Sequence, residues 1–287
     1  DTTALDRRSD GDTLAWRFTG DRRRAHLRVR RITDDGVRRI DRRAVHPDTA
    51  GDQPSGWLDL RSPGGAADDY MAGPNLEQVA LDHLRSGELA GLQSVLATWW
   101  AVAARSAVER TVAESEAHPF LPAGTRTVLP GDHLDLGLDN LVGPADRPDE
   151  VRFVDDEWEA AGGVDRDLAA LRTCWKLATA LVAAGTRHPW PAGMTADRLA
   201  GEFCRLLPHP VGPEQVDDLH AAEAALRVAA LGGEFATHVA QLRAAGRRSV
   251  ADPTVGDGRR SPLRRRLAAL KRLPGGERLA DLVRRLR

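Results

Sequence analysis

The spacing of apolar residues changes its period near Asn75, and this change limits the folds that the chain can adopt. Before it, apolar and polar residues alternate, as is typical of strands with one buried face. The alternation covers residues 14–19, 25–32 and 37–40. After it, apolar residues recur at helical spacing from Leu76 to Leu84, and Asn75 is a residue type that commonly caps a helix. We therefore expect an α+β fold with a β-rich first part and a mainly helical remainder.

Prolines and glycines divide the remainder into further expected helices. These helices cover residues 89–116, 165–184 and 195–207, with one or two more in 214–245. Residues 47–69 are rich in Pro, Gly and Asp and should contain at most one strand, at 57–60. The expected organisation is a β-rich part (1–70), a mainly helical part (71–250) and a basic tail (251–287).

A polar loop framed by short apolar pieces carries the residues with the most specific spacing. Its sequence reads His133-x-Asp135-x4-Asn140, and a short apolar run then ends in Asp155. A carboxylate here can accept the proton of an attacking hydroxyl, while an amide and a second carboxylate can hold Mg²⁺ against nucleotide phosphates. The chain has only two Asn residues, so a chance match to this spacing is improbable.

These residues resemble the catalytic loop of the protein-kinase and aminoglycoside-phosphotransferase superfamily. The pair of motifs, D-x4-N from Asp135 to Asn140 and D-x-E-W from Asp155 to Trp158, is also similar to a bacterial subgroup. That subgroup is found fused to, or beside, methyltransferase and glycosyltransferase domains of surface-polysaccharide pathways, as in bifunctional methyltransferase–kinase proteins. The resemblance covers about residues 70–185. Glu157 either supports the metal loop or lies on the surface.

The resemblance implies a two-lobed kinase-like fold, with a small β-rich N-terminal lobe and a helical C-terminal lobe. It implies an ATP- and Mg²⁺-dependent phosphotransferase that acts on a hydroxyl of a small molecule or glycan. In this interpretation Asp135 is the catalytic base, and His133 belongs to the catalytic loop as support for its backbone. Asn140 and Asp155 are the expected metal ligands.

Nucleotide contacts are expected from two further places. The segment from Tyr70 to Leu76 resembles the hinge where a nucleotide base docks, which makes Tyr70 and Gly73 candidate contacts. A kinase normally has a lysine on the third strand for the α- and β-phosphates. We expect an arginine, Arg28, Arg30 or Arg39, to contact the phosphates instead, although arginine is not interchangeable with lysine in a tight phosphate site.

Two departures from the family pattern keep a second interpretation open. Neither of the two lysines, Lys176 and Lys271, lies in the first lobe, and no G-x-G-x-x-G loop is present. The alternative is a catalytically degenerate pseudokinase, a binding or adaptor module that docks a methyltransferase or glycosyltransferase. A standalone methyltransferase is disfavoured because the sequence has no glycine-rich strand–loop for its cofactor.

Charge is distributed unevenly along the chain. Residues 259–287 hold eleven Arg and Lys against two acidic residues, a net charge of +9, so the rest of the chain carries −10. The tail predicts two short basic amphipathic helices, which either contact an anionic membrane, dock a partner or pack on the domain. Nucleic acid is not an expected partner, because the main body is acidic.

The cysteines and the chain start bear on the expected compartment. Cys174 and Cys204 are far apart in sequence and have no zinc-site spacing, so we expect free buried thiols in a reducing cytoplasm. The polar first residues lack the apolar core of a signal peptide. The expected location is cytoplasmic, with peripheral contact at the inner face of the membrane through residues 259–287.

Overall fold

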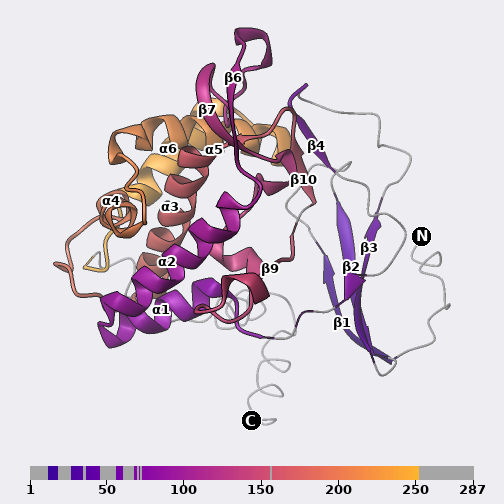
Figure 1. Ribbon diagram of the computed structural model, residues 1–287, viewed down its shortest axis with the longest axis horizontal. Coiled ribbons are helices and arrows are strands. Elements are labelled where there is room, and N and C mark those ends of the chain that lie inside the picture. Colours follow the sequence, from indigo (N-terminus) through magenta and orange to yellow (C-terminus); the bar gives the residue numbers. More distant parts are fainter. Residues whose placement is uncertain are drawn as a thin grey trace, which may run out of the picture.

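The computed structural model describes residues 12–18, 27–34, 37–45, 56–60, 68–69, 71, 73–155 and 157–251. These residues form small antiparallel sheets and six α-helices, which is the α+β class that the sequence predicts. A four-stranded sheet lies beside a larger helical body, and two short strands, β4 and β10, lie between them (Figure 1).

The four-stranded sheet is formed by the alternating segments near the start of the chain. Its order is β1-β2-β3-β5, and all neighbours are antiparallel. Arg30 lies directly opposite Arg42 on the next strand, so their side chains share one face of the sheet. The strand bounds are β1 Asp12–Phe18, β2 Arg28–Asp34, β3 Arg38–Ala44 and β5 Asp68–Asp69.

The helical body begins where the period changes. Asn75 caps the first helix, since its side-chain oxygen accepts the backbone N–H of Gln78 at 2.8 Å. Asp165 caps the central helix in the same way by accepting the N–H of Leu168 at 2.8 Å. The helices are α1 Leu76–Ser86, α2 Leu89–Ala104, α3 Arg166–Ala184, α4 Ala196–Leu206, α5 Val216–Leu231 and α6 Phe235–Gly246.

The prediction of one helix over residues 89–116 is wrong in its second half. Helix α2 ends at Ala104, and residues 108–112 form strand β6 instead. This strand pairs with β7 (Gly124–Leu129), which also pairs with β11 (Val164–Asp165). Because β6 is rich in β-branched residues and is paired along its whole length, strand formation outweighs continuation of the helix.

The prediction of at most one strand in residues 47–69 is also wrong. Besides β4 (Leu58–Leu60), this stretch contains β5, a two-residue strand without apolar alternation that pairs with the edge of β3. Strand β4 does not join the four-stranded sheet but pairs with β10 (Trp158–Ala160). This pairing ties the first part of the chain to the segment that follows Asp155.

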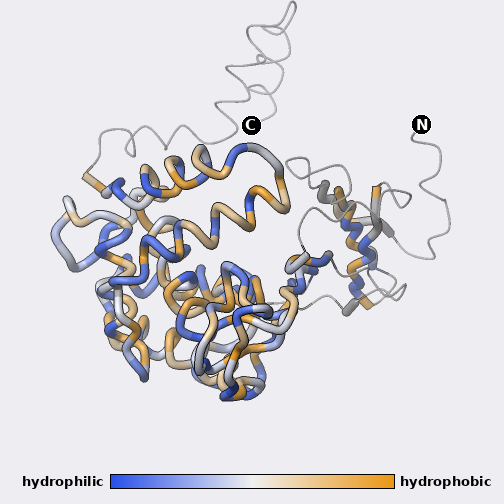
Figure 2. Tube along the Cα trace, turned by 90° about the horizontal axis from the view of Figure 1, so that it is seen from above, coloured by the Kyte–Doolittle hydropathy of each residue, from blue (hydrophilic) through white to orange (hydrophobic). Residues whose placement is uncertain are grey.

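One hydrophobic core holds the helices together, and α3 runs through its middle. Figure 2 shows hydrophobic and hydrophilic residues alternating along the helices around this centre, with the sheet set to one side. Cys174 on α3 and Cys204 on α4 are both buried and free, as expected. A hydrogen bond between the two thiols, together with burial, raises the pKa of Cys174.

The basic segment 259–287 lies outside the described residues, so its membrane, partner and packing interpretations stay predictions. Among the residues that the structure describes, no helix is long and apolar enough to cross a membrane. The division into a β-rich lobe, a helical lobe and a tail also stays a prediction.

Candidate functional site

The polar loop between β7 and β8 is anchored by its leucines. Leu134, Leu136 and Leu138 are each at most 2% exposed, so the loop is pinned to the core at every second residue. The intervening Asp135 is a quarter exposed. The buried leucines on either side therefore fix the backbone of Asp135 and leave its carboxylate partly exposed. Beyond the loop, β8 (Leu141–Val142) and β9 (Arg152–Phe153) form an antiparallel hairpin.

Helix α3 supplies two cations to Asp135. Its Oδ1 accepts hydrogen bonds from Arg172 Nη1 at 2.8 Å and from Lys176 Nζ at 3.2 Å. Arg172 and Lys176 are four residues apart and so lie on one face of the helix. The other oxygen, Oδ2, accepts a hydrogen bond from Asn140 Nδ2 at 3.1 Å, and the same nitrogen donates to the backbone oxygen of Asp135 at 2.9 Å. The spacing of five residues thus closes the loop on itself.

These contacts fix the charge of Asp135. Burial alone would raise the pKa of this carboxyl, but Lys176 and Arg172 outweigh burial and lower its pKa to about 2. Asp135 is therefore ionised at neutral pH and is a weak base. Such a group is better suited to orient a hydroxyl than to remove its proton before transfer begins.

The low pKa of Asp135 predicts a pH-dependent stability. The folded-state pKa is about 2 against an ordinary value of 3.8, so this stabilisation is complete above about pH 4 and is lost as pH falls toward 2. The shift corresponds to about 2 kcal/mol. We expect Asp135→Asn to lower the free energy of unfolding by about this amount at pH 6 and by almost nothing near pH 2, as measured by urea titrations.

Asp149→Asn is the matched control for that titration, because Asp149 forms an exposed ion pair with Arg105. Its effect should be small at every pH. A destabilisation by Asp135→Asn that keeps its full size at pH 2 would show that the loss is one of packing rather than of charge.

Asp155 lies next to this group and is bound from the sheet. Arg30 Nη2 on β2 donates to Asp155 Oδ1 at 2.7 Å and lies 3.2 Å from Glu157 Oε2. Its cross-strand neighbour Arg42 donates to the backbone oxygen of Val154 at 2.6 Å. One face of the sheet therefore reaches across to the segment that follows β9.

The Asp155 environment has more negative than positive charge. Burial raises the pKa of Asp155, Arg30 opposes this, and the nearby carboxylates of Glu157 and Asp135 raise it further. Glu157 is only 6% exposed, so the structure buries the residue that the sequence left open between support and surface. Two carboxylates thus share the Arg30 guanidinium close to a third, Asp135.

His133 holds the loop. Its Nδ1 lies 2.8 Å from Asp132 Oδ1, its Nε2 lies 3.4 Å from Ser106 Oγ, and its ring packs against Phe153 at 5.6 Å between centroids. These contacts join the loop to the start of β6 and to β9. They use both ring nitrogens.

No protein-family model, no curated protein and no solved structure matches the chain.

The structure shows no contact between the other candidate nucleotide-binding residues that it describes and Asp135 or Asp155. Arg39 is exposed on β3 and lies on the opposite face of the sheet from Arg42, because the two are an odd number of residues apart. Gly73 has a φ of 140°, which favours glycine, and lies beside Val142 at the start of the hairpin. Tyr70 lies outside the described residues.

The sequence interpretation missed Arg172 and Lys176 as parts of the site. Both lie more than thirty residues beyond the loop, and a helical period alone does not show which residue faces which loop. One signal was present: Lys176 is one of only two lysines in a chain whose other basic side chains are almost all arginine. Arg172 also forms an ion pair with Glu223 of α5 and is itself buried.

The positions of these side chains show whether they could bind a metal ion. Within the described residues, no group of three or more His, Cys, Asp or Glu side chains is arranged to hold a metal ion. Mg²⁺, however, is commonly bound by one or two carboxylates together with substrate phosphates, and not by a full protein cage. Asp155 with its surplus of neighbouring negative charge, and Asn140, fit that limited requirement.

Proposed function

We propose that this chain is an ATP- and Mg²⁺-dependent phosphotransferase with a two-lobed kinase-like architecture. Its acceptor is a hydroxyl of a small molecule or glycan, in a surface-polysaccharide, methyltransferase or glycosyltransferase pathway. The observation that carries the proposal is the convergence of Asp135, Asn140 and Asp155 around one short hairpin, with Arg30 reaching in from the sheet. The four-stranded sheet is the proposed small lobe, and the helical body is the large one.

Each of these residues has a separate proposed role. Asp135, ionised and held by two cations, orients the acceptor hydroxyl and takes up its proton as transfer proceeds. Asn140 and Asp155 would hold Mg²⁺, which supplies charge neutralisation for the phosphates. Phosphoryl transfer relies mainly on positioning and charge, so a few well-placed groups suffice.

Arg30 is the proposed replacement for the family lysine. Its guanidinium already lies 2.7 Å from Asp155 and 3.2 Å from Glu157, at the place where phosphates would meet the metal ligands. An arginine makes forked contacts with phosphate oxygens and does not lose its charge on burial. Lys176 forms ion pairs with Asp135 and Asp139 and so stabilises the loop from helix α3.

One observation favours the adaptor alternative. Asp155 and Asp135 are both paired with cations of the protein itself, so each must exchange or share a partner before it serves a nucleotide. A degenerate kinase-like module that docks a methyltransferase or glycosyltransferase would keep such pairs permanently.

Thermal stabilisation by nucleotide tests the proposal. We expect ATP with Mg²⁺ to raise the Tm of the wild-type protein, as a ligand specific for the folded state must. The rise should be lost in Asp155→Ala, reduced in Arg30→Ala and reduced less in Arg30→Lys, which keeps the positive charge but loses the forked contact. Each shift is measured against the same variant without nucleotide, so that changes in basal stability cancel.

Arg39→Ala is the matched control, because Arg39 lies on the opposite face of the same sheet from Arg42 and is exposed. It should keep the full nucleotide shift. Absence of any shift in the wild type removes ATP binding altogether. A shift that persists in Asp155→Ala places the nucleotide elsewhere.

A further inference from the structure

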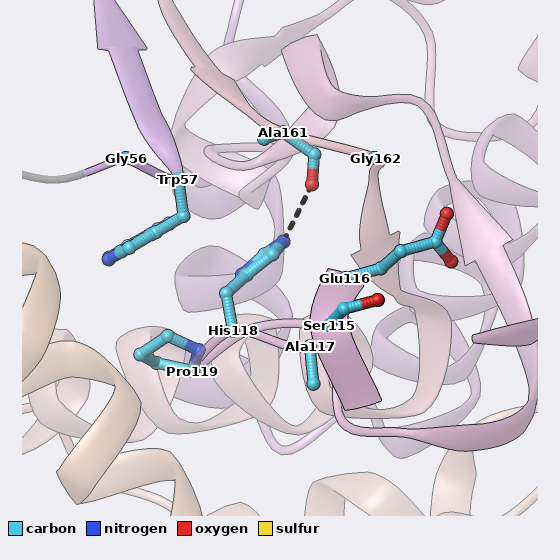
Figure 3. A pocket seen from close by; sticks show the side chains of 9 residues that line it. All are labelled: Gly56, Trp57, Ser115, Glu116, Ala117, His118, Pro119, Ala161 and Gly162. Atoms are coloured by element: carbon cyan, nitrogen blue, oxygen red, sulfur yellow. Dashed lines mark hydrogen bonds between the residues drawn. The ribbon is translucent and has the colours of Figure 1, made fainter. Parts of the chain in front are cut away.

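A cavity lies at the far end of β10 from Asp155. It is lined by residues 56–57, 115–119 and 161–162 and has a volume of about 480 Å³. That volume falls within the roughly 300–1,000 Å³ of pockets that hold small molecules. Figure 3 shows the rings of Trp57 and His118 side by side, with the carbonyl of Ala161 hydrogen-bonded to His118 and with Ser115 and Glu116 on the side of His118 away from Trp57. None of these residues takes part in the Asp135 and Asp155 contacts.

The pair of rings formed by Trp57 and His118 is rigid. The two rings are stacked, with centroids 5.1 Å apart and planes 11° from parallel. His118 Nε2 lies 2.9 Å from the backbone oxygen of Ala161 and 3.1 Å from that of Gly163. Its Nδ1 accepts the N–H of Phe120 at 3.2 Å, so the neutral ring carries its proton on Nε2. Burial lowers the pKa of His118 and keeps this form.

A backbone hydrogen bond also joins two of the lining segments, residues 56–57 and 161–162. The N–H of Ala161 donates to the backbone oxygen of Trp57 at 2.7 Å. The platform is therefore formed before any ligand arrives, which reduces the entropy lost on binding.

The lining that the structure describes has no cationic side chain that would attract an anionic ligand. Glu116 is the charged side chain among the lining residues. Arg110, which lies 3.6 Å from Glu116, donates to the backbone oxygen of Gly162 at 2.7 Å. The remaining polar groups are the hydroxyl of Ser115, the indole N–H of Trp57, the imidazole of His118 and backbone groups. An aromatic face beside acceptor oxygens and a hydroxyl suits a neutral ring that carries hydroxyl groups.

The position of the cavity relates it to the proposed reaction. Ala161 follows β10 directly and is six residues from Asp155, so at about 3.3 Å per residue the two are at most about 20 Å apart. Gly131, at the start of the Asp135 loop, packs against the backbone of Ala160, where an added Cβ would lie 2.1 Å from the carbonyl oxygen. One extended molecule can reach both places.

We propose that this cavity binds a sugar unit of a glycan acceptor. An apolar sugar face would lie on the His118 ring, which Trp57 backs, with hydroxyls on Ser115 and Glu116 on the same side of that ring. The unit bound here is remote from the one that reacts, so the acceptor is an oligosaccharide and not a single sugar. This inference rests on the proposed phosphotransferase for the role of acceptor, but the binding itself requires neither nucleotide nor turnover.

Saturation-transfer NMR without nucleotide tests the binding. The probes are trisaccharides of glucose, mannose and galactose, titrated against the full chain. We expect at least one to bind the wild type, and Trp57→Ala, which removes the ring that backs His118, to weaken it about 2- to 10-fold, the range of one aromatic contact. Ala117→Trp, which fills the cavity from an exposed position and leaves the Trp57–His118 stack in place, should abolish binding.

Two controls separate this site from the rest of the molecule. Trp190→Phe alters a tryptophan that packs on His188 and Phe203, outside the cavity, and should keep binding unchanged. Asp139→Asn, in the same loop, should also keep it, because the probe is held by the cavity. Loss of binding in Asp139→Asn would place the sugar at the loop instead and overturn the inference.

The remaining outcomes are equally decisive. No binding of any probe to the wild type, or equal binding to Ala117→Trp, overturns the inference even if Mg-ATP stabilises the protein. Binding that depends on Trp57 in a protein that ATP does not stabilise keeps the sugar site and removes the phosphotransferase.

Discussion

Replacing Arg172 by alanine is expected to lower the free energy of unfolding by about 3–5 kcal/mol, the range for loss of one partner from a buried ion pair. The Arg172 side chain is 9% exposed and contacts both Glu223, at 10%, and Asp135. Without it, Glu223 keeps a buried charge with no compensation. The expected fall in Tm is roughly 6–20 °C for a domain of this size, measurable by scanning calorimetry.

The control is Arg243→Ala. Arg243 forms the same kind of pair with Asp217, but there the side chains are 50% and 77% exposed, so the loss should stay within about 1 kcal/mol. The double variant Arg172→Ala with Glu223→Ala should recover part of the stability, because it removes the orphaned carboxylate. If the single and double variants are equally unstable, the effect comes from lost packing and the buried pair is not its cause.

Replacing Asp135 by asparagine is expected to lower phosphoryl transfer by about 10²- to 10⁴-fold, the usual contribution of a positioned acid–base group. Asparagine keeps the size of the side chain but loses the charge and the ability to take up a proton. Stabilisation by Mg-ATP should survive, because the proposed nucleotide contacts are Arg30, Asn140 and Asp155. The measurement is release of phosphate from ATP to water and transfer to oligosaccharides, alongside the nucleotide-induced Tm shift.

Asp139→Asn is the matched control for this variant. Asp139 lies in the same loop and pairs with the same Lys176, at 3.0 Å, but makes no contact with the other proposed site residues. Its transfer rate should stay within a few-fold of the wild type. Equal rates in wild type and Asp135→Asn, with ATP bound in both, would favour a binding module over an enzyme.

The sequence indicated the features that are local. The five-residue interval from Asp135 to Asn140 depends on short-range geometry, which spacing encodes. The helix beginning at Leu76 was equally predictable, because Asn75 caps it and apolar residues follow at helical period. In each case the relevant physics acts within a few residues of chain.

What the sequence did not predict depends on packing between distant segments. In the sequence, Arg172 and Lys176 are two polar residues of an expected helix. They contact Asp135 only because α3 packs against the loop. Strand β6 depends on its pairing with β7, which lies outside residues 89–116, so apolar spacing within that segment does not reveal it. Burial of Glu157 likewise depends on the sheet, since Arg30 on β2 is its counter-charge.

The pairing of β4 with β10 bears on the order in which the protein folds. This pairing and the contact between Arg30 and Asp155, 125 residues apart, each close a long loop of chain. Closing such loops is entropically unfavourable until other contacts are present, whereas contacts such as α1 with α2 form locally. The helical body should therefore assemble first. A kinetic intermediate with native helices but no capacity to bind nucleotide is the expected consequence, because the residues proposed to hold the phosphates meet last.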